Sequence, residues 1–405
     1  MGKHFRHRPG LVMAAALIAV VATSCGTSGT SPSKSPSPSS GIPTNITANS
    51  FDNTFSVMKQ LTGLAAQGKG KIGVILPDTA SSARYVDFDA PYLAQAFKTA
   101  GLSSSQYKID NAQGSDATEL TLAQADITDG ASVLLVDPLD SGVGASIESY
   151  AKAHGVAVID YDRLVLGGSR EYYVSFNNVT VGKVIGQGLV DCISAWNVKS
   201  PHVFELDGAP TDNNATLFAQ GYNSVLNPYF QNGTYVKVGE IAVPSWDNQQ
   251  ALTIFQQQFT AHKDINAVVT ANDGLGNAVI SVLKAQNIPP KTIPTTGQDA
   301  TLQGMQNILQ GYQCMSVYKP IYLEAQAAVA LALYVRAGVT PPSGLVNGTT
   351  QDTTSKVAVP SILLTPVSVN ASNMASTVIR DKFISATELC AAVGASVCSQ
   401  YGISG

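Results

Sequence analysis

The chain has 405 residues, of which 44% are hydrophobic and 13% charged, and five are cysteines. This length leaves room for about two domains with cores of their own, and the low charge excludes a highly charged disordered chain. Residues 1–24 hold three basic residues and no acidic one, so the remainder has 21 basic and 28 acidic residues, a net charge of −7. That sign is unsuited to holding phosphates, which excludes a nucleic-acid partner.

The first 24 residues have the order of a signal peptide. The basic stretch MGKHFRHR precedes the apolar run Leu11–Ala22, and small residues follow. This run is shorter than the roughly 20 residues that span a bilayer, and no later segment is long and apolar enough to do so. Cys25 follows Ala-Thr-Ser and resembles the lipid-accepting cysteine of bacterial lipoproteins, with Ala22 in place of the usual Leu. We therefore expect cleavage before Cys25 and acylation of its thiol, with an ordinary secretory signal as the alternative.

The segment after Cys25 has the composition of a flexible tether. Fourteen of the fifteen residues from 26 to 40 are Gly, Ser, Thr or Pro, a composition that cannot bury a core. Residues 25–68 are thus expected to form a lipid-anchored tether and a short leader. The sequence predicts an extracytoplasmic protein that is anchored to the cell membrane through the lipid on Cys25 only.

From Lys71 onward, apolar runs rich in β-branched residues alternate with amphipathic stretches. This alternation predicts an α/β fold with parallel sheets. The expected strands are 72–76, 133–136, 156–160, 203–206, 267–270 and 314–317, and the expected helices are 90–100, 116–128, 144–154, 182–193, 276–286 and 322–336. No Gly-x-Gly-x-x-Gly or Walker-type loop opens any of these helices, so no nucleotide cofactor is expected.

Polar clusters follow these strands, at the carboxyl ends where open α/β sheets bind ligands. Planar charged groups can hold vicinal hydroxyls, and aromatic faces can cover the C–H faces of a sugar ring. The polar clusters, with Tyr85, Phe176 and Trp246 nearby, therefore fit a polyhydroxylated ligand. A single Asn-Asp pair after a strand is more often a helix cap or a turn, but six clusters in one topological position favour a ligand site. The candidate sugar-binding residues are Arg84, Tyr85, Asp162, Arg163, Asn213, Asn214, Trp246, Asn272, Asp273, Gln298, Asp299 and Lys319.

Several motifs together resemble one known family. These are VILPDTASSARY, VIDYDRL, YYVSFNNVTVG, GAPTDNNATLF, TANDGLGNA, TGQDA, MSVYKPI and VPSILLTPVSV, which run from about Lys71 to Leu389. They resemble the D-xylose-binding branch of the type I periplasmic-binding-protein family, which serves bacterial sugar ABC transporters and includes ribose and galactose receptors.

The resemblance implies two α/β lobes, each a parallel-sheet sandwich, with a sugar between them. The chain would cross between the lobes in three hinge segments, near Arg170–Asn177, Met315–Lys319 and Val357–Thr365. The N-terminal lobe would comprise residues 69–168 and 320–356, the C-terminal lobe residues 176–314 and 366–389, and the tail residues 390–405.

The resemblance also implies roles for single residues. Arg84, Asp162 and Arg163 would contact the sugar from the first lobe. Tyr85 stands where the family often has Trp. The first loop differs in length from that of Gram-negative xylose receptors, which leaves the alignment of Asp78 open. The remaining contacts would be Asn213 or Asn214, Trp246, Asn272, Asp299 and Lys319.

The implied mechanism is that of a monomeric receptor without cofactor or metal. The lobes would close on a monosaccharide, and the permease of an ABC transporter would recognise the closed form and accept the sugar. A receptor that docks to a signalling partner would use the same closed form, so this alternative remains open.

Two other protein classes fit less well. A glycosidase could use Asp162, Asp273 and Asp299 as acid and base, but Arg84, Arg163 and Lys319 are expected to hold such acids ionised. The motifs of serine and zinc hydrolases are absent from the sequence. A sugar-responsive repressor would need a helix-turn-helix where this chain has a signal peptide and a tether.

Four cysteines follow Cys25, and in an oxidising compartment an even number suggests disulfides with three possible pairings. Cys390 and Cys398 are close in sequence, and a disulfide between them would hold the C-terminal tail. Cys192 and Cys314 would then form the second disulfide by elimination. Free buried thiols are the alternative.

Overall fold

The computed structural model describes residues 41–405. The predicted signal peptide, Cys25 and the tether of residues 26–40 lie outside the described residues. No helix among residues 41–405 is both long and apolar enough to span a membrane.

The N-terminal lobe is built on a seven-stranded sheet with the spatial order β10-β11-β5-β4-β3-β1-β2. All neighbouring strands are parallel except β10, which runs antiparallel to β11. Central strands such as β1 and β3 are apolar along most of their length because helices cover both faces of the sheet. The strands are β1 (Lys71–Leu76), β2 (Tyr107–Asn111), β3 (Ala131–Val136), β4 (Ala157–Tyr161), β5 (Tyr172–Phe176), β10 (Gly348–Gln351) and β11 (Ala358–Leu364).

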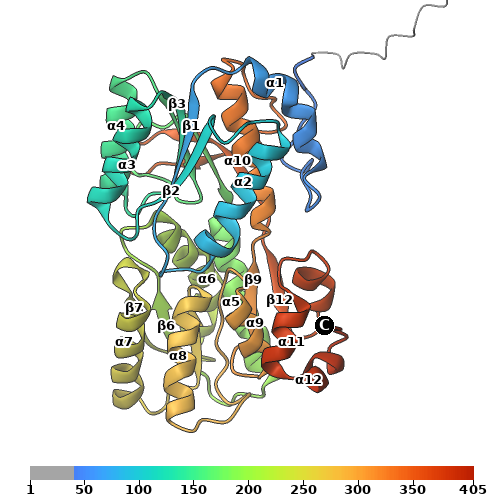
Figure 1. Ribbon diagram of the computed structural model, residues 1–405. Helices are drawn as coiled ribbons and strands as arrows, with labels where there is room; N and C mark the ends of the chain where they lie inside the picture. The colour runs from blue at the N-terminus through green and yellow to red at the C-terminus, as the bar shows by residue number, and fades with distance from the viewer. Residues whose placement is uncertain (1–40) are drawn as a thin grey trace, which may run out of the picture. The chain divides into compact units, whose positions relative to one another are not determined.

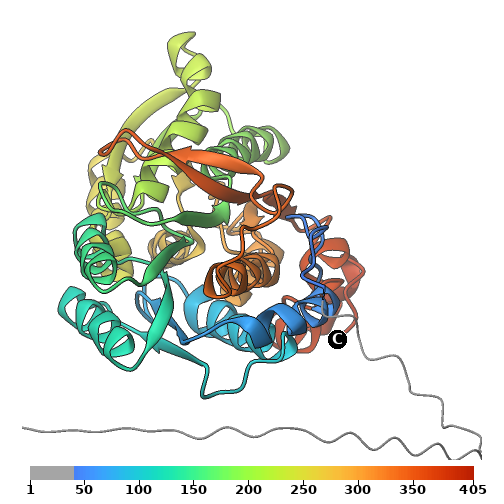
Figure 2. The ribbon, with the colours of Figure 1, turned by 90° about the horizontal axis from the view of Figure 1, so that it is seen from above.

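Helices from distant parts of the chain cover this sheet. One face carries α3 and α4, and the other carries α2 and α10, so that the late helix α10 lies beside the early helices in Figures 1 and 2. The leader also belongs to the core, since Phe55, Met58 and Leu61 are buried. The helical segments are η1 (Ser56–Leu61), α1 (Thr62–Gln67), η2 (Tyr85–Asp89), α2 (Ala90–Thr99), α3 (Asp116–Thr128), α4 (Ser141–Ala153) and α10 (Ile321–Arg336).

The C-terminal lobe contains a parallel sheet of order β7-β6-β8 and an antiparallel pair, β12-β9. The strands are β6 (His202–Asp207), β7 (Val236–Ala242), β8 (Ala267–Thr270), β9 (Met315–Tyr318) and β12 (Val367–Asn370). The helical segments are α5 (Asn178–Ala195), α6 (Asn213–Gln231), η3 (Pro244–Trp246), α7 (Asn248–Ala261), α8 (Asp273–Ala285), α9 (Leu302–Leu309), η4 (Ala375–Ile379), α11 (Ala386–Val393) and α12 (Ala395–Gln400).

The chain passes between the two lobes after β5, after β9 and after β11. The segments 170–177 and 357–365 contain β5 and β11, which are both strands of the N-terminal sheet, so the chain crosses at the carboxyl ends of these strands. The middle passage runs from β9 through Lys319 and Pro320 into α10. Lys319 therefore lies at a hinge between the lobes.

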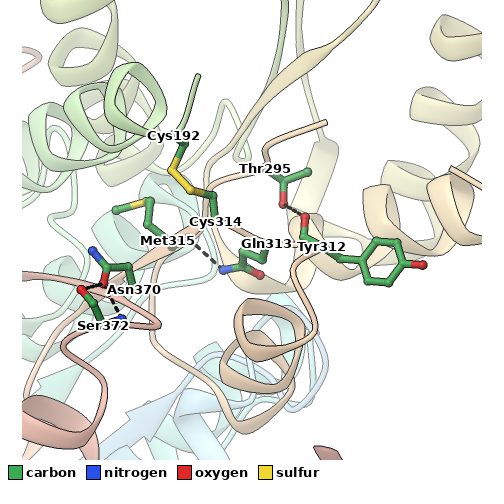
Figure 3. The surroundings of a disulfide bond; sticks show 8 residues. All are labelled: Cys192, Thr295, Tyr312, Gln313, Cys314, Met315, Asn370 and Ser372. Atoms are coloured by element: carbon green, nitrogen blue, oxygen red, sulfur yellow. Dashed lines mark hydrogen bonds between the residues drawn. A yellow bond between two sulfur atoms is a disulfide. The ribbon is translucent and has the colours of Figure 1, made fainter. Parts of the chain in front are cut away.

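Two disulfides join the four cysteines, in the pairing that was predicted from their spacing in the sequence and by elimination. Cys390 and Cys398 link α11 to α12, with their Cα atoms 5.7 Å apart. Cys192, near the end of α5, is linked to Cys314, directly before β9, across 122 residues (Figure 3). Because β9 leads to Lys319, this second disulfide fixes the strand that positions the hinge.

Candidate ligand-binding site

The carboxyl ends of strands from both lobes meet at one small pocket. Its lining includes ten of the twelve candidate residues from the sequence, and most of its side chains are polar or charged. The lining residues are Ser81, Ser82, Arg84, Tyr85, Asp162, Arg163, Asp212, Asn214, Phe218, Trp246, Asn272, Gln298, Asp299 and Lys319.

Arg84 is the most enclosed cation of this site, with 1% of its surface exposed. Its Nη1 donates to Asp162 Oδ1 at 2.6 Å. Its Nε and Nη2 donate to the two oxygens of Asp89 at 2.9 and 2.7 Å, and Nη2 also donates to Glu324 Oε2 at 2.8 Å. Three carboxylates from η2, the end of β4 and α10 therefore fix one guanidinium at the pocket wall.

Asp162 joins Arg84 to the aromatic part of the wall. The hydroxyl of Tyr85 donates to Asp162 Oδ2 at 3.3 Å and accepts from Arg163 Nη2 at 2.9 Å. Both guanidinium carbons lie over the Tyr85 ring, at 5.4 Å for Arg84 and 5.5 Å for Arg163. Tyr85 therefore contacts two cations of the pocket wall.

Burial opposes the ionisation of Asp162, but the nearby cations Arg84, Lys319 and Arg163 hold its pKa below the ordinary value. Asp162 is thus a carboxylate with acceptor capacity for hydroxyl groups. For Asp162 this agrees with the expectation that the cations hold such an acid ionised. For Asp273 that expectation is wrong, because no arginine or lysine among residues 41–405 forms a salt bridge with it and burial raises its pKa to about 7.

The backbone carbonyl of Asp162 is held by side chains from both lobes. Asn214 Nδ2 donates to the Asp162 carbonyl at 2.8 Å, and the hydroxyls of Tyr173 and Ser175 donate to the same oxygen at 2.7 and 2.8 Å. These bonds hold Asp162 at φ 56°, a left-handed conformation that is uncommon for a non-glycine residue. Asn214 therefore joins the two lobes beneath the pocket.

The opposite wall is formed by Trp246 and Asp212. Trp246 Nε1 donates to Asp212 Oδ2 at 3.0 Å, and Arg163 Nε lies 3.4 Å from the same oxygen. The indole packs so closely on Gly208 that a Cβ there would overlap the ring. The glycine thus makes room for the aromatic wall, which is the kind of surface that covers the C–H face of a sugar.

Lys319 and Asp299 form a buried ion pair at the hinge. Their Nζ and Oδ1 atoms are 3.0 Å apart, and each residue is 3% exposed. Ser82 Oγ of the N-terminal lobe donates to Asp299 Oδ2 at 2.9 Å, so this pair also joins the lobes. Asp299 has φ 88° and Trp246 has φ 55°, so with Asp162 three lining residues have a left-handed backbone conformation.

Two candidate residues do not reach the pocket. Asn213 is the first residue of α6, and the preceding Asp212 lines the pocket in its place. Asp273 is buried and accepts hydrogen bonds from Gln313, Ser316 and Thr301, which tie the start of α8 to neighbouring loops. Both are polar residues at the starts of helices. This is the structural role that the sequence spacing alone could not distinguish from a ligand contact.

Sequence reasoning missed Ser81, Ser82, Asp212 and Phe218 of the lining, and the supporting residues Asp89 and Glu324. The polar clusters after the strands contain Ser81, Ser82 and Asp212, so their position at the strand ends could have identified these residues as candidates. Glu324 lies inside α10 and had no such signal. Phe176 is fully buried in the core and does not line the pocket.

Among the described residues, one acidic group has the spacing of metal ligands: Glu205, Asp207 and Glu240. Lys237 Nζ lies 2.7 Å from Glu205 Oε2 and 2.6 Å from Glu240 Oε2. The ammonium therefore supplies the positive charge that these carboxylates need.

Comparison with known proteins relates this geometry to a family. A family model described as a periplasmic binding protein domain matches residues 72–338. The D-xylose-binding periplasmic protein of Escherichia coli K12 is 34% identical over 332 residues, which cover 81% of this chain and 96% of that protein. The multiple sugar-binding periplasmic protein SbpA of Azospirillum brasilense is 33% identical and covers 78% and 89% respectively.

The solved structures include a carbohydrate transporter solute-binding protein from Chloroflexus aurantiacus in complex with D-glucose. It has a TM-score of 0.69 and 27% identity, and the match covers 78% of this chain and 97% of that one. The two-lobed topology, the family match and these relatives agree. The chain belongs to the family of periplasmic binding protein domains and has the type I α/β fold.

Proposed function

We propose that this chain is an extracytoplasmic receptor that captures one monosaccharide between its lobes and delivers it to the permease of an ABC transporter. The carrying observation is a pocket whose charged and amide side chains come from both lobes. Such a pocket has the donor and acceptor groups that the hydroxyls of one sugar ring need, and Trp246 and Phe218 supply apolar surface.

D-Xylose is the proposed ligand. A relative with 34% identity over most of the chain is named a D-xylose-binding periplasmic protein, and this similarity supports a pentose as the ligand. Other relatives are named multiple sugar-binding proteins, and two solved neighbours contain glucose. We therefore expect an aldose site in which D-xylose is preferred over D-glucose.

Closure of the lobes would carry the signal to the permease. Ser82 with Asp299, and Asn248 Nδ2 with the Ala80 carbonyl at 3.1 Å, join the lobes around the pocket. A sugar that contacts both walls stabilises this closed form relative to an open one, and the hinges absorb the rotation.

Trp246 gives a direct signal of binding, because it is 4% exposed in the closed pocket wall and its surroundings change with closure. Addition of D-xylose to residues 41–405 should change the tryptophan fluorescence with one-to-one stoichiometry. Trp196→Phe should keep this change, since Trp196 lies outside the pocket lining, whereas Trp246→Phe should abolish it.

The same titration separates a receptor from an enzyme when the sugar is recovered afterwards. A receptor returns D-xylose unchanged, and aryl xylosides are not cleaved. Consumption of the pentose or release of the aryl group would favour a sugar-processing enzyme and overturn the receptor proposal.

We also propose that the lipid on Cys25 anchors the receptor. Cys25→Ser should move the protein from the membrane fraction to the soluble fraction, because no described helix can span a bilayer. Sugar binding should be unaltered. Equal membrane retention of both proteins would contradict the anchor and leave the binding proposal intact.

A further inference from the structure

Two carboxyl groups support Arg84 from outside the pocket. Asp89 and Glu324 contact Arg84 but do not line the cavity, whereas Arg84 and Asp162 do. Asp89 and Glu324 have no measurable exposure. Burying two carboxyl groups is costly unless each is well paired, so their common partner Arg84 is the reason that they can lie there.

The hydrogen bonds of Arg84 leave one donor for a ligand. A guanidinium has five N–H groups in a fixed plane. Nε and Nη2 donate to Asp89, Nη2 donates to Glu324, and Nη1 donates to Asp162, which together use four of the five. The fifth N–H belongs to Nη1, the nitrogen on the side of Asp162 and the pocket.

We propose that Asp89 and Glu324 are positioning residues that lock the plane of Arg84, so that its free Nη1 hydrogen is offered to a sugar hydroxyl. This inference rests on the proposed sugar-binding function. Asp89 is itself fixed, because the hydroxyl of Tyr161 at the end of β4 donates to Asp89 Oδ1 at 2.5 Å. Glu324 lies in the first turn of α10, directly after the hinge at Lys319, so it couples Arg84 to the hinge segment.

The charges around Glu324 make this support sensitive to pH. Burial raises the pKa of Glu324 to about 8, Asp162 and Asp89 act in the same direction, and Arg84 and Lys319 act against it. The phenols of Tyr161 and Tyr173 also face this cluster. Glu324 Oε1 has no hydrogen-bond partner among the described residues.

The sign of the pH effect follows from closure. Glu324 is fully buried in this closed form, where its pKa is about 8. An open form would let water reach the pocket wall and favour the charged carboxylate, so the pKa is higher in the closed, sugar-bound state. Binding therefore takes up a proton, and the affinity should fall as the pH rises from 6 to 9. A neutral glutamine at this position keeps an acceptor for Arg84 Nη2 but cannot titrate.

Calorimetric titration with D-xylose at pH 6, 7, 8 and 9 tests the inference on the intact chain and its variants. Glu324→Gln should match the wild-type affinity at pH 6 within about twofold and remove the part of the fall near pH 8. Glu324→Leu and Asp89→Asn should each weaken binding about tenfold or more at pH 6, since one displaced charged hydrogen bond has that effect. Glu205→Gln is the matched control, because Glu205 is a buried glutamate with a pKa of about 7 that does not line the pocket.

The outcomes separate this inference from the proposed function. Wild-type binding with an unchanged affinity and pH profile in folded Glu324→Gln, Glu324→Leu and Asp89→Asn overturns the positioning role alone. A loss of thermal stability without a change in affinity would mean that the pair only supports the fold, and also overturns it. No binding of D-xylose or any other aldose by the wild type overturns both.

Discussion

Alanine at Asp299 or at Lys319 lowers the affinity for D-xylose about a hundredfold or more. Each residue offers charged hydrogen bonds in a pocket that loses its water on closure, and such bonds contribute about 1.5 to 3 kcal/mol each. Removal of one partner also leaves the opposite charge unpaired, since their atoms are only 3.0 Å apart. Calorimetric titration of both variants measures the loss.

The fold of these two variants should remain native by circular dichroism. Their ion pair borders the cavity, so water can reach the remaining charge in the ligand-free protein. Lys98→Ala, on the exposed side of α2, is the control and should bind as the wild type does. Wild-type affinity in both site variants would mean that the sugar contacts lie elsewhere.

Replacement of Arg84 by methionine should instead destabilise the whole N-terminal lobe. The substitution leaves Asp89, Asp162 and Glu324 without the cation that pairs with all three. Breaking a buried ion pair in this way costs about 3 to 5 kcal/mol, because the Asp162 carboxylate loses a paired cation and Asp89 and Glu324 lose the hydrogen bonds from Arg84. The midpoint of urea unfolding should fall accordingly, and sugar binding should be lost in the protein that remains folded.

Arg380→Met is the matched control for this experiment. Arg380 pairs with Asp381 at 2.8 Å, but its side chain is 68% exposed, and without it Asp381 keeps the hydrogen bonds from the Tyr318 and Tyr322 hydroxyls. Its unfolding curve should coincide with that of the wild type. Equal curves for Arg84→Met and the wild type would contradict the role of Arg84 as the common partner of the three carboxyl groups.

The alternation of apolar runs and amphipathic stretches predicted the main elements of the fold. All six expected strands and all six expected helices are present within a few residues of their predicted bounds, as for β1 and α10. Six strands were not predicted: β2, β5, β7, β10, β11 and β12, of which β5 and β11 lie in segments expected to be hinges. β7 and β10 have mostly half-buried or exposed residues because they lie at sheet edges, so the buried-strand pattern is absent.

The pocket could be predicted to a large extent because strand ends converge in parallel sheets. Arg84, Asp162 and Lys319 follow strands or lie in the loops after them, and all three line the cavity. What the sequence could not give was which neighbour in a cluster points inward. The sequence TDNN offered Asp212, Asn213 and Asn214, and the caps of α6 decide that Asp212 and Asn214 reach the pocket while Asn213 does not.

The support beneath the pocket had no local pattern at all. Asp89 lies in a short helical turn, and Glu324 follows the helical periodicity of α10 in a position that a core residue would occupy. Only the tertiary packing of α10 on the N-terminal sheet brings Glu324 to Arg84, 240 residues away in sequence. Sequence motifs therefore do not identify side chains that act by positioning another side chain, because only tertiary packing brings the two together.

One calorimetric titration of residues 41–405 with a panel of aldoses tests the central claim most directly. The panel contains D-xylose, D-ribose, D-glucose, D-galactose and L-arabinose, at pH 7 and with the recovered sugars analysed. The account predicts saturable one-to-one binding that is tightest for D-xylose, with every sugar recovered unchanged. Absence of binding heat for every aldose, or chemical conversion of a bound sugar, would contradict it.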